Sequence, residues 1–351
     1  MNEQITLFGL DKPTTTNTIP TNERTNERTN GKKIGLIDCD GHKYPNIPLM
    51  KISAWHKRQG DTVEWYDAFS GLVKEYDKVY CSKVFSFTPD YEYPIYAKEI
   101  EKGGTGYCIT IENGREVFQK ERNHNLPDEI EHTYPDYSLY PELTKDTAYG
   151  FLSRGCPRGC DFCIVKDKEG LCSRKVADLS EFWNGQKNIV LCDPNILACK
   201  DWEDLLQQLI DSKAKVDFNQ GLDIRMMNER KAEMLSQIPI KAIHFAYDRI
   251  EDRDFIEPKF KVFREKSKVN PHDLQVFVLT GDRQRRVTED DLHRIYWLKE
   301  NGYAPYVMIY KKYELPRGHE LLKLQRYVNN RIIFWSCESF EYYKANERKY
   351  R

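Results

Sequence analysis

Cys156-Pro-Arg-Gly-Cys160-Asp-Phe162-Cys163 is the stretch of this 351-residue chain that says most about its fold and its chemistry. It holds three cysteines at C-x3-C-x2-C spacing, which as thiolates can bind three irons of a cubane iron–sulfur cluster. The fourth iron would receive no ligand from this run. Structural metal sites are normally closed, whereas catalytic sites keep one position open. The spacing therefore favours a cluster that reacts over one that only supports the fold.

This run resembles the signature of the radical S-adenosylmethionine (radical SAM) superfamily. The resemblance implies a [4Fe-4S] cluster on Cys156, Cys160 and Cys163, with SAM bound to the open iron and Phe162 near the adenine. The implied reaction is reductive cleavage of SAM to a 5′-deoxyadenosyl radical that acts on an unidentified substrate. A reductase, or an electron donor of the flavodoxin or ferredoxin type, would be a partner. The cofactors supply this chemistry, and the protein binds and orients them.

The alternative is a closed iron–sulfur or zinc site in a structural or binding protein without SAM chemistry. Cys172 lies nine positions after Cys163 and could be the fourth ligand. Zinc sites usually show two C-x2-C pairs, whereas only Cys160 and Cys163 have that spacing here. The chain has ten cysteines, and we expect no disulfide framework because no signal peptide precedes them.

Composition narrows the class of partner. The chain has 54 Lys and Arg residues against 55 Asp and Glu residues, a formal net charge of -1. This balance gives no overall attraction to nucleic acid, and it neither shows nor forbids a local basic surface. No apolar run approaches the roughly 18 residues of a membrane span, so we expect no membrane association. Unpaired cysteines and an oxygen-sensitive cluster suit a reducing cytoplasm.

Changes in composition and periodicity divide the chain into five parts. The first is rich in Thr, Asn and Pro, repeats Thr-Asn-Glu-Arg in tandem and is expected to be disordered. We expect an α/β protein in which a Rossmann-like domain precedes the partial (β/α)6 barrel that the radical SAM resemblance implies. The predicted parts are a tail (1–32), a Rossmann-like domain (33–125), a linker (126–147), the barrel (148–317) and a carboxyl-terminal extension (318–351).

The Rossmann-like domain is expected from strands at 33–38, 62–66 and 79–84, and we also predict a helix over 93–102. In the superfamily a domain of this kind resembles a cobalamin-binding domain. Its fingerprint D-x-H-x-x-G is met by Asp40 and His42, but Pro45 occupies the glycine position. Because the close approach that glycine permits is then lost, we expect this fold without cobalamin. His42 is the candidate ligand if cobalamin does bind.

Six apolar segments with helical patterns between them follow, as expected of parallel strands that are covered on both faces. Thr288 and Asp291 have capping-box spacing, and Asp201 can cap an earlier helix. His244 lies inside one strand, and we expect a satisfied core histidine rather than a base. The predicted strands are 148–152, 188–192, 216–220, 242–246, 275–279 and 306–310.

The barrel resemblance places the chemistry at the carboxyl ends of these strands. Asp193 and Asn195 are acceptors suited to the ammonium group of SAM. A second group of strand-end residues would contact the ribose hydroxyls or the SAM carboxylate: Gln220, Asp223 and Arg225. In this group the planar guanidinium of Arg225 suits a carboxylate. Thr280-Gly281 resembles the backbone segment beside the adenine. For each polar residue the alternative is a cap or a strand-end hydrogen bond.

Overall fold

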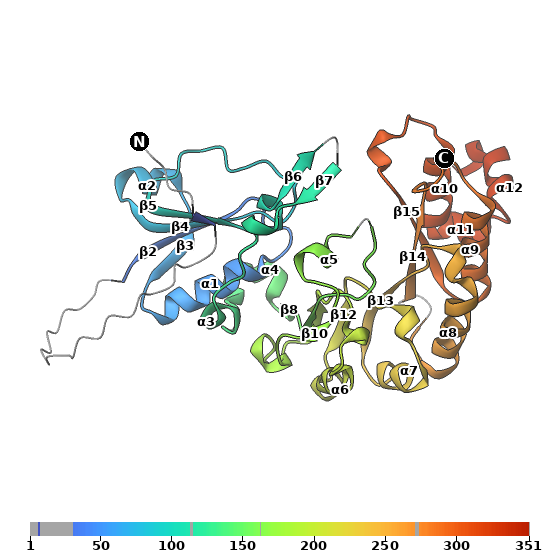
Figure 1. Cartoon of the computed structure of the whole chain (residues 1–351), viewed down its shortest axis with the longest axis horizontal. Helices are drawn as coiled ribbons and strands as arrows, with labels where there is room; N and C mark the ends of the chain where they lie inside the picture. Colours follow the sequence, from blue (N-terminus) through green and yellow to red (C-terminus); the bar gives the residue numbers. More distant parts are fainter. Residues whose placement is uncertain (1–5, 8–30, 113–114, 162, 271–273, 351) are drawn as a thin grey trace, which may run out of the picture. The chain divides into compact units, whose positions relative to one another are not determined.

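Figure 1 shows a computed structural model of the chain, which describes residues 6–7, 31–112, 115–161, 163–270 and 274–350. The chain divides into two compact units, which we call the amino-terminal and carboxyl-terminal units. Each unit contains a parallel sheet with helices, which confirms the α/β class. The amino-terminal unit runs to Tyr149 and includes Cys160–Glu169 and Ser180–Asn184, and the carboxyl-terminal unit holds the remainder.

The amino-terminal sheet has the strand order β1-β5-β4-β2-β3, and all its pairs are parallel. Consecutive residues of a strand face opposite sides, so Leu36 packs with Leu49 of helix α1 while Ile37 packs with Tyr76 and Val79. Both faces are therefore buried. The elements are β1 (Thr6–Leu7), β2 (Lys33–Asp38), α1 (Ile47–Arg58), β3 (Thr62–Trp65), α2 (Ala68–Val73), β4 (Tyr76–Ser82) and β5 (Ala97–Gly103).

The predicted helix over 93–102 is wrong, because Ala97–Gly103 forms strand β5. Its charged residues pair across the sheet. Lys78 Nζ of β4 lies 2.7 Å from Glu99 Oε1 and 2.5 Å from Glu101 Oε2, and Val79 is in register with Ile100. Cross-strand pairing of this kind overrides the helical preference of a Lys- and Glu-rich segment.

Shorter elements follow the amino-terminal sheet in the sequence, before and after the cysteine run. An antiparallel hairpin pairs β6 with β7, and a second antiparallel pair joins β9 to β10 on either side of the cysteines. These elements are β6 (Ile109–Glu112), β7 (Arg115–Phe118), α3 (Asp128–Glu131), α4 (Pro141–Thr144), β9 (Ser153–Arg154), α5 (Val165–Lys168) and β10 (Arg174–Lys175).

The second large sheet has the order β15-β14-β13-β12-β11-β8, so its strands lie side by side in the order of the sequence. The pairs from β11 to β15 are parallel. The strands are β8 (Thr147–Gly150), β11 (Asn188–Leu191), β12 (Lys215–Phe218), β13 (Ile240–Ala246), β14 (Leu274–Thr280) and β15 (Ala304–Ile309). The helices are α6 (Trp202–Ser212), α7 (Glu229–Leu235), α8 (Arg253–Lys266), α9 (Glu289–Glu300), α10 (Glu320–Asn329), α11 (Arg331–Ser336) and α12 (Phe340–Ala345).

The two faces of this sheet differ. Phe245 of β13 packs on Phe260 and Phe263 of α8, so its face of the sheet is the helix-covered one. Along each strand, the residues that alternate with the buried side chains of this helix-covered face are only partly buried. We call their side the inner face, and its side chains include Asp217, His244, Gln275, Phe277 and Tyr306.

Two predicted caps have different outcomes. Thr288 and Asp291 form the predicted capping box, in which Thr288 Oγ1 accepts from Asp291 N at 3.1 Å and Asp291 Oδ2 accepts from Thr288 N at 2.9 Å. Asp201 occupies the N-cap position of α6, but its side chain makes no capping hydrogen bond. The capping box fixes the start of α9, which carries a key arginine described below.

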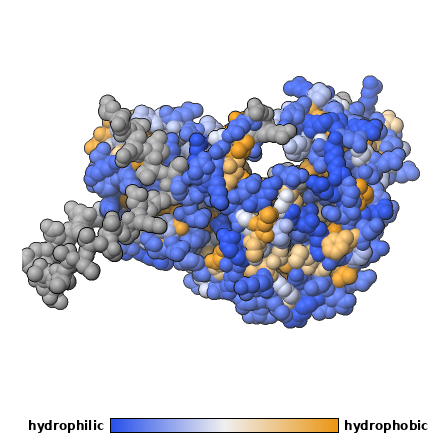
Figure 2. All heavy atoms as spheres, viewed as in Figure 1, coloured by the Kyte–Doolittle hydropathy of each residue, from blue (hydrophilic) through white to orange (hydrophobic). Residues whose placement is uncertain are grey.

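The face of the molecule drawn in Figure 2 is largely polar. Hydrophilic residues cover most of the face seen in Figure 2, and hydrophobic residues form smaller patches between them. Among the residues that the structure describes, no helix combines the length and the apolarity needed to cross a bilayer.

Gly104 and Gly60 allow a matched test of packing in the amino-terminal unit. Both have positive φ, at 98° and 86°. A Cβ on Gly104 would lie 2.4 Å from Lys83 O, whereas one on Gly60 meets nothing within 4 Å. Gly60→Ala should cost only the ~1–2 kcal/mol of left-handed backbone, and Gly104→Ala about 1–3 kcal/mol more through overpacking. Urea unfolding measures both, and equal losses would contradict this packing.

Candidate functional site

The cysteine run begins where β9 ends. Gly155 and Gly159 have φ of 88° and 59°, which gives the chain the tight turns it makes there. Cys156 N donates to Gly170 O at 3.2 Å, and Cys163 N donates to Cys160 O at 3.1 Å. The three thiols of the run are partly exposed, and Phe162 lies outside the described residues.

The candidate metal ligands are dispersed in the described structure. Within the described part of the chain, no three His, Cys, Asp or Glu side chains are grouped as metal ligands would be. The assignment of Cys156, Cys160 and Cys163 to a cluster stays a prediction. Cys172, the fourth ligand in the closed-site alternative, is exposed and its thiol donates to Ser173 O at 3.7 Å.

Four of the predicted site residues form one hydrogen-bonded chain at the strand ends of the carboxyl-terminal unit. Asn195 follows β11, and its Nδ2 lies 3.4 Å from Cys156 Sγ and 3.3 Å from Asp223 Oδ2. Asp223 follows β12 and accepts two bonds from Arg225, from Nε at 3.1 Å and from Nη2 at 3.0 Å. The carboxyl ends of neighbouring parallel strands meet at one edge, which brings these side chains together.

Asn195 is the centre of this chain, and it lacks one partner. Its side chain is fully buried at 0 % exposure, and its amide nitrogen serves both Cys156 and Asp223. Its Oδ1 atom is buried and accepts no hydrogen bond. Buried polar atoms of native proteins nearly always have a partner, so this oxygen is a candidate hydrogen-bond acceptor for a group outside the chain.

Asp193 has a different role from its neighbour Asn195. Its carboxyl accepts from Leu152 N at 3.0 Å, and from both N and Oγ of Ser153, at 2.5 and 2.6 Å. It therefore ties the segment that leads into the cysteine run to the end of β11. Burial raises the pKa of Asp193 to about 6, although these hydrogen bonds oppose the rise. Its assignment to SAM stays a prediction.

The other predicted contacts lie apart from this chain of hydrogen bonds. Gln220 is exposed. Thr280 is completely buried, and its hydroxyl donates to Met308 O at 3.4 Å. Gly281 has a φ of 74°, and a Cβ there would lie 2.8 Å from Leu321 Cδ1, so its place is fixed by packing on α10. Their part in cofactor binding stays a prediction.

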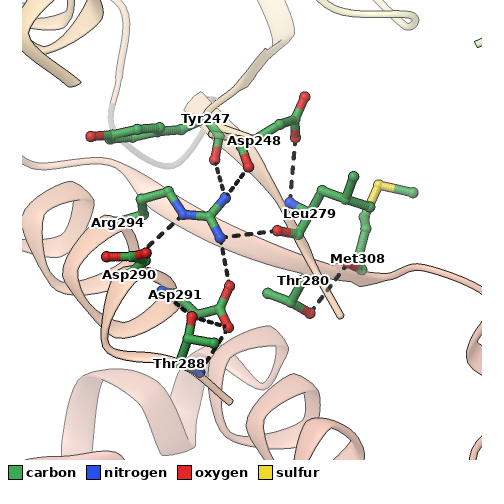
Figure 3. A network of polar contacts seen from close by, with 9 residues as sticks. All are labelled: Tyr247, Asp248, Leu279, Thr280, Thr288, Asp290, Asp291, Arg294 and Met308. Carbon is green, nitrogen blue, oxygen red and sulfur yellow. Dashed lines mark hydrogen bonds and ion pairs between the residues drawn. The ribbon is translucent and has the colours of Figure 1, made fainter. Parts of the chain in front are cut away.

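Sequence reasoning missed Arg294, which fixes the ends of β13 and β14 (Figure 3). From α9 its guanidinium donates to the carbonyls of Tyr247, Asp248 and Leu279, with Nη1 2.9 Å from Tyr247 O and Nη2 3.1 Å from Leu279 O. Nη2 also pairs with Asp291, and both side chains are only 5 % exposed. The spacing of Asp291 and Arg294 indicates a helical pair, but nothing in the sequence indicates that Arg294 reaches strand ends.

Arg294 thereby sets the position of Asp248, which also belongs to the site region. Asp248 Oδ1 accepts from Leu279 N at 3.3 Å (Figure 3). Burial raises the pKa of Asp248, while the positive charge of Arg158 opposes the rise. Arg158 lies between Cys156 and Cys160, and its Nε is buried without a hydrogen-bond partner. The cysteine run thus carries a cation whose charge acts on a strand-end carboxyl.

The residues near His42 do not fit cobalamin. The His42 ring stacks on Trp65 at 4.1 Å, and the Asp40 carboxylate accepts from Val84 N and from Thr88 Oγ1. We derive no step through cobalamin.

Comparison with known proteins assigns this chain to no family. No family model and no curated protein matches the chain. Among solved structures, it is similar to the radical SAM methyltransferase TsrM from Kitasatospora setae, solved with tryptophan substrate and the SAM analogue aza-SAM. The identity is 12% over 79% of this chain and 67% of that chain, with a TM-score of 0.43. So distant a likeness carries no functional argument.

Arg294→Met should destabilise the carboxyl-terminal unit by about 3–5 kcal/mol, because Asp291 is left as a buried carboxylate without its cation. Arg230→Met is the matched control. Arg230 pairs with Glu203 through Nη2 at 2.8 Å, but these side chains are 58% and 56% exposed. Its loss should cost under ~1 kcal/mol. Thermal and urea unfolding compare the two variants. Similar losses of stability would contradict the role given to Arg294 at the strand ends.

Asp193 gives a pH dependence of stability. Its pKa rises from 3.8 to about 6 on folding, so between these values the folded chain holds a proton that the unfolded chain has lost. The contribution of Asp193 to the free energy of unfolding therefore falls as pH rises through this window, by up to ~2–3 kcal/mol at 1.36 kcal/mol per pKa unit. Asp193→Asn removes this slope. Urea unfolding of both proteins across the window measures it, and a difference that is constant with pH would contradict the buried titration.

Proposed function

We propose that this chain is a radical SAM enzyme with its active site at the strand ends of the six-stranded sheet. Cys156, Cys160 and Cys163 would hold a [4Fe-4S] cluster. When bound, the cluster would supply the electron that cleaves SAM to a 5′-deoxyadenosyl radical for use on the substrate. The sheet with its helices would form the partial (β/α)6 barrel, and the Rossmann-like domain would precede it.

The buried amide of Asn195 is the observation that carries this proposal. It links the first cysteine of the run to polar residues at the ends of two neighbouring strands, and it keeps an unused acceptor. Three cysteines, one of which accepts a hydrogen bond from a buried amide with an unused acceptor, fit a site that holds both a cluster and a ligand. A closed metal site gives no reason for an unpaired oxygen beside the metal.

Each member of this chain of hydrogen bonds has a definite task in the proposal. Asn195 Oδ1 would accept from the ammonium group of SAM, while its Nδ2 donates to Cys156 Sγ. Hydrogen bonds to ligating sulfurs tune cluster potential, so Asn195 would also affect reduction. Asp223 holds Arg225 through two bonds and fixes the plane of its guanidinium. Arg225 would then meet the SAM carboxylate in the planar geometry that suits it.

Arg158 and Asp248 would act beside the cluster. The charge of the Arg158 cation acts on the Asp248 carboxyl, which Arg294 and Leu279 keep in place. Held in this way, the pair would fix the part of the cysteine run between Cys156 and Cys160. An external reductase or a flavodoxin- or ferredoxin-type protein would deliver the electron, and a reducing cytoplasm would preserve the thiols.

The test is SAM cleavage by the full chain, loaded anaerobically with iron and sulfide and reduced with dithionite. Wild type should form 5′-deoxyadenosine, and Cys156→Ala, Cys160→Ala and Cys163→Ala should each abolish it. Cys172→Ala is the matched control and should keep activity. Asn195→Leu should keep iron but bind SAM at least ~10-fold more weakly, because a charge-assisted hydrogen bond is lost.

Two results would contradict the proposal. One is iron binding that depends on Cys172 as strongly as on Cys156, which indicates a closed site. The other is a fully iron-loaded protein that fails to bind SAM in an equilibrium dialysis experiment. SAM binding without cleavage would instead indicate that cleavage requires the substrate.

A further inference from the structure

The inner face of the six-stranded sheet carries a second polar cluster, away from the cysteine run in sequence. Asp217 lies on β12, His244 on β13 and Gln275 on β14, which are consecutive strands of the sheet. His244 is in register with Gln275, and Asp217 is opposite Ala242, two residues before His244. The three side chains therefore share one face.

Two atoms of this cluster are buried without a partner. They are Asp217 Oδ1 and His244 Nδ1. Sequence reasoning expected a satisfied core histidine, and the structure corrects that expectation. An unpaired buried polar atom loses its water without compensation, and native proteins rarely keep one without a reason. The two atoms lie on adjacent strands, and Asp217 is close enough for its charge to act on His244.

The cluster is held rigidly by its surroundings. His244 O accepts from Leu222 N at 2.7 Å, and a Cβ on Gly221 would lie 2.9 Å from that same oxygen. The imidazole stacks on Phe277 with ring centroids 5.2 Å apart and planes at 8°. Lys241 Nζ lies 3.8 Å from Asp217 Oδ2, which leaves Oδ1 unpaired. The unpaired atoms thus belong to side chains that their neighbours hold in position.

Chemistry selects the kind of group that fits. An ionised carboxyl only accepts hydrogen bonds. Burial lowers the pKa of His244, which favours the neutral imidazole with one accepting nitrogen. Gln275 contacts the imidazole and adds a further polar edge. Phe277 and Tyr306 lie edge to face at 5.9 Å on the same face, beside the polar cluster. The complementary group is a flat ring that carries two N–H donors.

We propose that Asp217 and His244 bind the substrate through a pair of adjacent N–H donors, as in an amidine or an amino-substituted nitrogen heterocycle, with its ring against Phe277 and Tyr306. That the occupant is the substrate rests on the proposed radical SAM function. Binding at the cluster does not require iron or SAM, so the two can be tested apart.

Benzamidine is the probe, because it places two N–H donors on a flat ring, and benzoate has the same ring with acceptors only. Calorimetric titration of the full chain, without iron or SAM, should show benzamidine binding and much weaker benzoate binding. Asp217→Asn and His244→Phe should each weaken benzamidine binding at least ~10-fold, the effect of one lost charge-assisted hydrogen bond. Asp211→Asn, in an exposed part of α6, is the matched control and should bind normally.

Three outcomes would overturn this site: no benzamidine binding by wild type, equal binding of benzoate, or variants that bind as wild type does. Circular dichroism checks that each variant is folded. If one is not, Gln275→Leu replaces it, and the preference of wild type for benzamidine over benzoate still decides. A chain that binds benzamidine here but does not cleave SAM would keep this site and refute the proposed reaction.

Discussion

Parallel pairing of β11 to β15 is the constraint on which both sites depend. Because these strands run in one direction and in sequence order, the residues after each of them meet at a single edge of the sheet. Asn195 and Asp223 follow neighbouring strands and meet there for this reason. The same pairing puts Asp217, His244 and Gln275 on one face through the strand register. Changes to the register would separate both groups at once.

Two sets of buried polar groups in the carboxyl-terminal unit bear on the candidate sites. Arg294 and Asp193 have their hydrogen-bonding capacity used by backbone groups, and they hold strand ends and the entry to the cysteine run. Asn195, Asp217 and His244 each keep one buried atom unpaired. The satisfied set holds the strand ends in place, and the unsatisfied set supplies the acceptors that the proposed sites would use. Rigid supports around unsatisfied groups are what a binding site requires, since little ordering is left for the ligand to induce.

Much of this could be predicted from local patterns. Apolar runs locate the strands, capping-box spacing locates α9, and strand-end positions select Asn195, Asp223 and Arg225. Prediction failed where long-range contacts decide. The segment that forms β5 has helical composition, and its extended form is explained by cross-strand partners on β4 such as Lys78. Arg294 reaches strand ends far away in sequence. Whether a nitrogen of His244 stays unpaired depends on which neighbours lack a donor, and residue spacing does not contain that information.

An open iron beside Asn195 is the central claim. Its most direct test is the EPR spectrum of the anaerobically loaded, dithionite-reduced protein, recorded with and without SAM. Direct binding of SAM to an iron of the cluster changes the electronic environment of that iron, so we predict a clear shift of the g values on adding SAM. Asn195→Leu should reduce this shift at the same SAM concentration. A reduced cluster whose spectrum is identical with and without saturating SAM would contradict the account.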